Sequence, residues 1–357
     1  MDEFTMRSGL CFLAFWAAAA AVHAEVPGSI AIRGARVVPV SGPVMDTATV
    51  VIRDGLIAEA GPAASIPAGA FVIDGAGLTV YPGLIDAFSS WGIPQPASAA
   101  TQATARGGPQ QAALAALQTG QQQPRSQGPE DRPGTSPWVK AADLVRPSDA
   151  RLEAARSAGF TTAMTFPRGG LVSGHGAAVN LGGETAGAMV VSPSIGLLLS
   201  FTPGGYTGYP NTQMGAIAYF RQLWLDRAHY QLALQAYQAN PSGARRPAYD
   251  RALESLGGYP RLLLPAPSLV QLERALHLAA ELKETPVFYG AVEGYRMAEI
   301  LKRAGAPVIL NVRWPSRPRD ADPEQQDSLR TLELRDMAPQ SPKILAAAGV
   351  RFAISSD

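Results

Sequence analysis

The sequence contains little cysteine and little histidine: its 357 residues include one Cys and four His. The single cysteine, Cys11, falls within the first 24 residues, which have the pattern of a secretory signal peptide. A chain cleaved after that segment forms no disulfide bond and offers no thiolate ligand to zinc. Disulfide-stapled folds and cysteine-ligated metal sites are therefore excluded for the mature chain.

Long apolar runs are also scarce. The stretch from Leu10 to Val22 is apolar throughout, follows the basic Arg7 and ends near the small residue Ala24. This pattern predicts a signal peptide over residues 1–24, cleaved after Ala24, and a secreted or periplasmic protein. A retained N-terminal anchor is the alternative. No other stretch reaches the ~18 apolar residues of a membrane helix, so no transmembrane helix is expected in the mature chain.

Neither sign of charge dominates. Lys and Arg number 30 and Asp and Glu number 29, which gives a net charge of +1 and no reason to expect a nucleic-acid partner. Apolar residues make up 46% of the chain, enough for a sizeable core. The composition does not identify the small-molecule substrate or ligand, and it is compatible with an oligomer.

The first part of the mature chain, residues 25–80, predicts a small β domain. Residues 30–40 and 47–61 alternate in polarity and are rich in β-branched side chains. Asp54-Gly55 separates two strand-like runs and is typical of a two-residue hairpin turn. Asp74-Gly75 predicts a second hairpin turn of the same type. The glycines of this segment are not spaced so as to lead into a helix, so they do not indicate a nucleotide-binding loop.

Residues 93–137 differ in composition from the rest. Gln, Ala, Pro, Gly and Ser dominate, and β-branched and aromatic residues are few. Such a composition predicts a poorly packed, low-complexity insertion near one end of the following domain. A solvated loop with no role of its own is the simpler interpretation.

From Trp138 onward, strand and helix patterns alternate. The alternation predicts an α/β fold, and so many repeats favour a (β/α)₈ barrel over an open sheet, spanning residues 81–357. The expected helices are residues 149–160, 216–239, 268–284, 294–305 and 341–349. The expected strands are residues 161–167, 188–194, 195–201, 261–266, 285–291, 306–312 and 350–357, with a Gly-rich turn at 168–176.

Several of these segments resemble the amidohydrolase superfamily, in particular its imidazolonepropionase-like and secreted branch. The specific match is "VVIRDGLIAEAG" followed by "VIDGAGLTVYPGLIDA", with weaker matches in "AARSAGFTTAMTFPRGGLVSG", "EILKRAGAPVIL" and "LAAAGVRFAISSD". The resemblance implies a β-sandwich built from both chain ends and a barrel. Because the sequence stops at Asp357, where the family continues, we expect a barrel that is incomplete at its C-terminus.

The resemblance also implies hydrolysis of non-peptide C–N bonds by a water bound to zinc or another divalent metal. The family's His-x-His pair after "PGLID" is replaced by Phe88 and Ser90. Its next two histidines are replaced by Pro265 and by Tyr289 or Gly290, and no lysine lies between Lys140 and Lys283 to form a carbamylated bridge. The residue that is kept is Asp357, at the place of the catalytic aspartate.

Three histidines remain after the signal peptide. His229 and His277 fall in helical patterns and are expected on the outside of a barrel. His175 lies in the Gly-flanked turn after a strand, where the active-site loops of barrels lie. We therefore predict Asp357 and His175 as catalytic residues, with an ordinary turn residue as the alternative for His175. No metal ligands and no cofactor are expected.

Two hypotheses follow from these patterns. The first is an amidohydrolase-family hydrolase of non-peptide C–N bonds with a degenerate metal centre. The second is a non-catalytic, amidohydrolase-like binding or scaffold protein of the cell envelope. Metal content is the property that separates them most directly.

Overall fold

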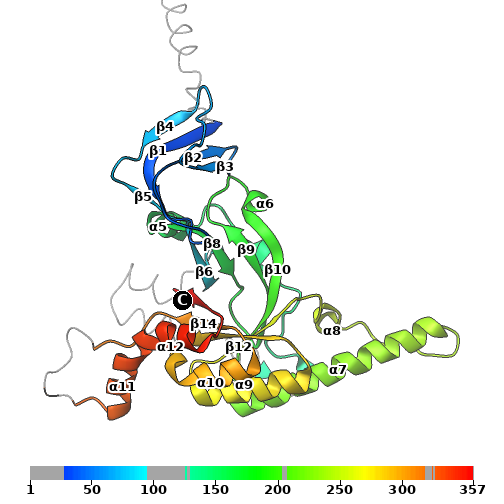
Figure 1. The fold of residues 1–357 in the computed structure, drawn as a ribbon. Coiled ribbons are helices and arrows are strands. Elements are labelled where there is room, and N and C mark those ends of the chain that lie inside the picture. Colours follow the sequence, from blue (N-terminus) through cyan, green and yellow to red (C-terminus); the bar gives the residue numbers. More distant parts are fainter. Residues whose placement is uncertain are drawn as a thin grey trace, which may run out of the picture. The chain divides into compact units, whose positions relative to one another are not determined.

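A computed structural model describes residues 28–94, 125–126, 129–202, 207–317, 324 and 326–356 (Figure 1). The chain divides into two compact units, Met1–Pro82 and Gly83–Asp357. The predicted signal peptide, most of the predicted insertion and Asp357 lie outside the described residues.

The first unit is a five-stranded sheet in the order β3-β2-β1-β4, with β5 also paired to β1. Its strands are β1 (Ser29–Val37), β2 (Met45–Arg53), β3 (Leu56–Gly61), β4 (Phe71–Asp74) and β5 (Thr79–Val80). Asp54 and Gly55, both with positive φ, form the hairpin between β2 and β3, as predicted. The second predicted hairpin, at Asp74-Gly75, is wrong because β4 and β5 both run parallel to β1. Gly75 instead lies so close to Ala35 that a side chain at position 75 would collide with it.

The second unit is mixed α/β and contains an eight-stranded sheet in the order β15-β14-β13-β12-β10-β9-β8-β6. The strands are β6 (Leu84–Ser89), β8 (Phe160–Thr165), β9 (Val172–Asn180), β10 (Val190–Leu199), β12 (Leu262–Pro265), β13 (Pro286–Ala291), β14 (Val308–Asn311) and β15 (Phe352–Ser355). A separate two-stranded pair joins β7 (Arg125–Ser126) and β11 (Thr207–Gly208). All strands of the large sheet run in one direction except β9, which is antiparallel to both β8 and β10.

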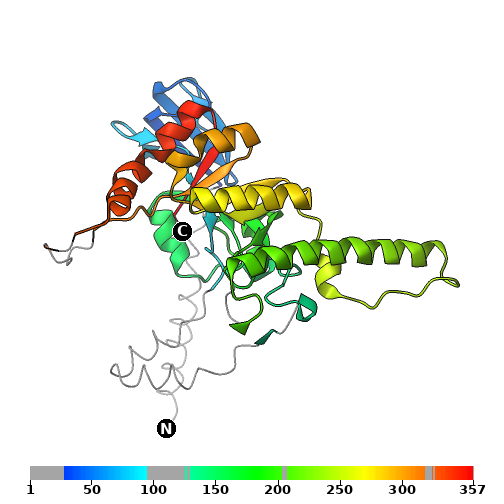
Figure 2. The ribbon, with the colours of Figure 1, turned by 90° about the horizontal axis from the view of Figure 1, so that it is seen from below.

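Helices accompany the strands, and all but the exposed helix Leu329–Met337 pack on the outer face of the sheet. They are α4 (Ala141–Leu144), α5 (Arg151–Ser157), α6 (Ala186–Met189), α7 (Gln213–Ala239), α8 (Arg251–Ser255), α9 (Leu269–Leu282), α10 (Gly294–Ala304), α11 (Leu329–Met337) and α12 (Ser341–Ala348), with short 3₁₀ turns at Pro129–Asp131 and Ala338–Gln340. Helix α9 buries Leu272, Ala275 and Leu278 along one face, the spacing expected of an amphipathic helix. Figure 2 shows α7 and α9 side by side, and α9 also contacts α10.

Two layers of apolar side chains lie on opposite faces of the large sheet. The outer layer lies between the strands and the helices and includes Leu197 and Leu199 of β10. The inner layer fills the space enclosed by the sheet and includes Phe88, Phe166, Leu198, Leu263 and Ile309. Because neighbouring residues of a strand point to opposite faces, this alternation defines which side chains face the interior.

The sheet is nearly closed where β15 meets β6. The Ser355 hydroxyl donates to the Phe88 carbonyl oxygen at 2.7 Å, and the Ser356 amide donates to the Asp86 carboxylate at 3.3 Å. The Ser356 hydroxyl also donates to the second oxygen of Asp86. Side-chain hydrogen bonds therefore connect the two edge strands.

Two predictions about this unit need correction. The Gly-rich turn predicted at 168–176 is wrong from Val172 onward, because those residues belong to β9, and its antiparallel course breaks the strict eightfold β/α alternation. The predicted insertion also extends too far: Thr135 is buried and its hydroxyl lies 2.6 Å from that of Tyr219, while Arg132 forms ion pairs with Asp226 and Asp250. Among the described helices, none combines the length and apolar character needed to cross a membrane.

Candidate functional site

Phe88 stands at the end of β6, where the family resemblance places the first metal-binding histidine. It is 4% exposed and stacks against two aromatic rings. Its ring centroid lies 5.1 Å from that of Phe166 and 4.5 Å from that of Tyr289, with interplanar angles of 28° and 16°. The guanidinium carbon of Arg168 lies 5.0 Å from the Phe88 ring centroid, within the range of a cation–π contact.

The groups around this stack are held in place by the strands. The Tyr289 hydroxyl donates to the Leu199 carbonyl oxygen at 2.8 Å, and burial raises the pKa of that phenol. Burial lowers the pKa of Arg168, and the positive charges of Arg151 and Arg313 lower it further, while Tyr289 and Asp86 act in the opposite direction. A guanidinium starts from so high a pKa that Arg168 remains charged near neutrality.

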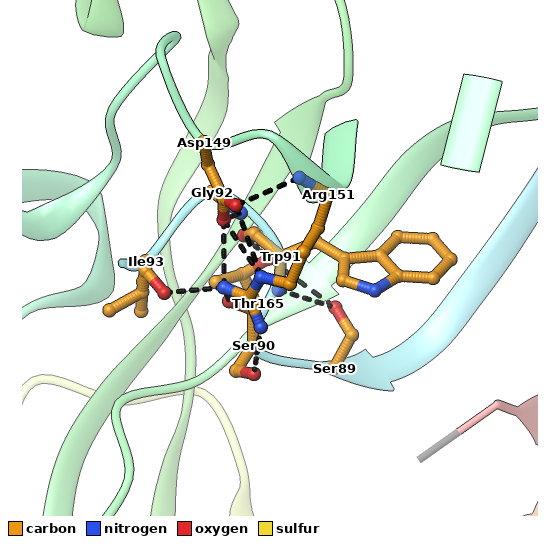
Figure 3. Close-up of polar contacts among 8 residues, drawn as sticks. All are labelled: Ser89, Ser90, Trp91, Gly92, Ile93, Asp149, Arg151 and Thr165. Carbon is orange, nitrogen blue, oxygen red and sulfur yellow. Dashed lines mark hydrogen bonds and ion pairs between the residues drawn. The ribbon is translucent and has the colours of Figure 1, made fainter. Parts of the chain in front are cut away.

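Ser90, at the second histidine position, belongs to a hydrogen-bonded turn rather than to an open site (Figure 3). Arg151 donates to the Ser90 hydroxyl at 3.2 Å, to the Ser90 carbonyl at 2.9 Å and to the Ile93 carbonyl. Asp149 accepts from the Gly92 amide at 3.0 Å and pairs with Arg151 at 2.7 Å. The Thr165 hydroxyl donates to the Trp91 carbonyl at 2.8 Å. This network fixes residues 90–93 to α5 and β8.

The pKa of Asp149 is lowered in the folded chain. Burial alone would raise this pKa, but the hydrogen bonds and charge of Arg151 and the Gly92 amide outweigh it. A carboxylate with a lowered folded pKa contributes stability above its unfolded pKa and loses that contribution as the pH falls through the folded pKa.

We therefore expect Asp149→Asn to lower the free energy of unfolding at pH 7 by roughly 1–3 kcal/mol, because a buried charge-assisted network is broken. The difference from the unmodified chain should shrink as the pH falls below about 4, the pKa of an unfolded aspartate, and on toward the lower pKa of the folded side chain. Urea unfolding at pH 7, 5 and 3 measures both effects. Asp336→Asn, at an exposed position of α11, is the matched control. A difference that is constant across this pH range would contradict the assigned role.

The side chains at the positions where the resemblance places metal ligands have other contacts or no ligand atom. Phe88 has no ligand atom, Pro265 ends β12 and Ser90 is bound to Arg151. Glu293, a further oxygen candidate, is buried but accepts from the Leu269 amide at 3.1 Å and from Arg330 at 3.2 Å. Within the described ranges, no three His, Cys, Asp or Glu side chains are grouped as metal ligands.

His175 was predicted in a Gly-flanked turn after a strand, and this placement is wrong. It lies within β9, where its neighbour Gly176 packs so closely against the Phe166 ring that a Cβ would lie 2.1 Å from it. Since Gly176 faces the interior, His175 points to the outer face. There its Nδ1 lies 3.0 Å from the Ser194 hydroxyl, and its ring is 6.1 Å from that of Tyr259. Burial lowers the pKa of His175, a hydrogen bond with the Ser255 backbone raises it, and Lys140 lowers it.

The remaining predicted positions are placed as follows. His229 and His277 lie on α7 and α9 and are exposed, as expected for the outside of the sheet. Asp357 is outside the described residues, so its role as a catalytic base stays a prediction. Sequence reasoning missed Arg151, Asp149 and Arg168. Only Arg168 carried a signal, since it directly follows the predicted strand at residues 161–167.

Similarity to known proteins is found among solved structures. No protein-family model and no curated protein matches the sequence. Among solved structures, an amidohydrolase from Thermotoga maritima MSB8 is similar, with a TM-score of 0.68 and 21% identity over 92% of this chain and 78% of that one. The A. niger ochratoxinase also matches, at 14% identity, over 93% of this chain and 76% of that one, with a TM-score of 0.40. The first similarity shows that the chain has an amidohydrolase fold.

Proposed function

We propose that this chain is an amidohydrolase-type protein with a degenerate metal centre, and that it acts by binding a ligand rather than by metal-dependent hydrolysis. The observation that carries the proposal is the buried ring of Phe88, which stacks against Phe166 and Tyr289 and contacts the guanidinium of Arg168. In the family the same position is expected to hold a histidine ligand. Export to the periplasm or the exterior, based on residues 1–24, is part of the same proposal.

A metal-activated water requires a metal ion that the protein holds with several ligands. A divalent ion lowers the pKa of its bound water only when several N, O or S ligands hold it. An aromatic ring supplies none, and a charged guanidinium close by repels a divalent cation. Asp86, the carboxylate of "GLIDA", has its oxygens engaged by the Phe88 amide and by Ser356. These contacts favour a structural role for Asp86.

A second candidate is hydrolysis of non-peptide C–N bonds without the family's metal. The amidohydrolase fold and the predicted position of Asp357 favour it, since a carboxylate after the last strand could take a proton from an attacking water. His175, the other predicted catalytic residue, points to the outer face and would act there. The two residues are therefore tested separately.

Hydrolysis assays distinguish the candidates. N-acyl amino acids and cyclic amides serve as substrates, each with added zinc or with a chelator. The binding proposal predicts no zinc-dependent turnover. Hydrolysis that resists the chelator and is lost in Asp357→Asn would support the second candidate. Turnover that is lost with the chelator and restored by zinc would overturn the degenerate centre.

A further inference from the structure

A cavity of about 740 Å³ lies on the outer face of the second unit, beside His175. It is lined by β9 and β10, by α7, by α8 with the turn that follows it, and by the segment that leads into α4. Its volume falls within the range of small-molecule binding sites, roughly 300–1,000 Å³. Neither Phe88 nor any other residue of the aromatic stack lines it.

Positive charge is concentrated on the wall of this cavity. Lys140, Arg227 and Arg251 line it, and the carboxylate among the lining residues is Glu254. That carboxylate already accepts a hydrogen bond from the Tyr230 hydroxyl at 2.6 Å. His175 has a lowered pKa, chiefly through burial, and so adds no positive charge at neutral pH. The lining therefore carries more positive than negative charge.

Two of the cationic groups are positioned by their surroundings. The guanidinium carbon of Arg251 lies 4.5 Å from the ring centroid of Trp138, which also lines the cavity. Arg227 lies against Gly257: a Cβ at position 257 would be 2.8 Å from a terminal nitrogen of the Arg227 guanidinium. Within the part of the chain that is described, the buried Nε of Arg227 has no hydrogen-bond partner. A buried donor without an acceptor is costly, and a bound anion would supply the acceptor.

Uncharged polar groups complete the lining. Ser194 and Gln231 contribute side chains, and Gly257 and Gly258 contribute backbone without side chains. The cavity is much larger than a single phosphate or carboxylate group needs. Its walls would therefore suit a hydrophilic molecule whose remaining atoms also form hydrogen bonds, rather than an apolar one.

We propose that this cavity binds a small hydrophilic molecule that carries at least two negative charges, as a phosphate monoester or as a dicarboxylate. Lys140, Arg227 and Arg251 would form charge-assisted hydrogen bonds with those charges. The proposal concerns a different face of the sheet from the aromatic stack and does not depend on the absence of hydrolysis.

Calorimetric titration of the whole chain tests the proposal with four probes: inorganic phosphate, succinate, glucose 6-phosphate and uncharged glucose. We expect glucose 6-phosphate or succinate to bind and glucose not to bind, with affinity falling as salt is added. Tighter binding of glucose 6-phosphate would indicate a phosphate site, and tighter binding of succinate would indicate a dicarboxylate site. Failure of all three anions to bind, or equal binding of glucose, would overturn the proposal.

Paired variants locate the binding. Lys140→Gln combined with Arg251→Gln removes two exposed cations of the cavity, and the affinity should fall about tenfold or more. Lys302→Gln combined with Arg303→Gln removes the same charge from exposed positions on α10 and should leave the affinity unchanged. Thermal unfolding checks that both variants are folded. Equal affinities for the two double variants would mean that the anion binds elsewhere and would contradict the assignment.

Discussion

Phe88→Ala is expected to lower the free energy of unfolding by about 3–5 kcal/mol, as is typical for a buried aromatic side chain. The ring is 4% exposed and contacts both Phe166 and Tyr289, so its loss leaves a cavity in the inner layer and removes two aromatic contacts. Arg168 also loses the ring face over which it lies. Urea unfolding followed by tryptophan fluorescence measures the change.

Two control variants define this result. Phe88→Leu keeps most of the buried volume and should cost clearly less than Phe88→Ala. Leu232→Ala, at a position on α7 that is 64% exposed, should change the stability by no more than about 0.5 kcal/mol. A Phe88→Ala variant as stable as the Leu232→Ala control would show that the ring does not support the inner layer.

Asp86→Ala is expected to cost a similar amount, about 3–5 kcal/mol, and to loosen the contact between β6 and β15. The side chain is fully buried and accepts from the Phe88 amide at 3.2 Å, from the Ser356 amide at 3.3 Å and from the Ser356 hydroxyl. Removing the carboxylate leaves the buried Phe88 amide and the partly buried Ser356 donors without this acceptor. Faster amide exchange in β6 and β15, measured by hydrogen–deuterium exchange, would accompany the loss of stability.

The matched variants for Asp86 separate closure of the sheet from a general loss of charge. Asp86→Asn keeps one acceptor oxygen and should be less destabilising than Asp86→Ala. Asp336→Ala removes an exposed carboxylate from α11 and should alter neither stability nor exchange appreciably. Exchange that rises evenly over the whole second unit, without a local increase in β6 and β15, would argue against the closing role.

Regular patterns in the sequence predicted most helices and strands after Trp138. Helices α7, α9, α10 and α12 and strands β12 to β15 follow apolar periodicities that local chemistry determines. Strand β9 was missed because its glycines are typical of a turn. In the structure Gly174 and Gly176 are glycines because other groups approach closely: the Val139 carbonyl lies beside the first and the Phe166 ring beside the second. Only the tertiary contacts reveal this reason.

The site was harder to predict than the fold. The resemblance predicts that Phe88 and Ser90 stand where ligands are expected, but not which contacts those residues make. Ser90 is held by Arg151, which lies 61 positions further along the chain, and no local pattern indicates such a partner. The position of His175 depended on its strand and on which neighbour faced the interior. The wrong placement of His175 in a turn thus follows directly from the error about β9.

The central proposal is that aromatic and hydrogen-bonding residues occupy the positions where the resemblance places metal ligands. Zinc content of the purified full chain, expressed with zinc in the medium, tests it most directly, with thermal unfolding recorded before and after a chelator. The account predicts zinc well below one ion per chain and an unfolding midpoint that the chelator does not change. One zinc per chain, together with a midpoint that falls on chelation and recovers when zinc is restored, would contradict it.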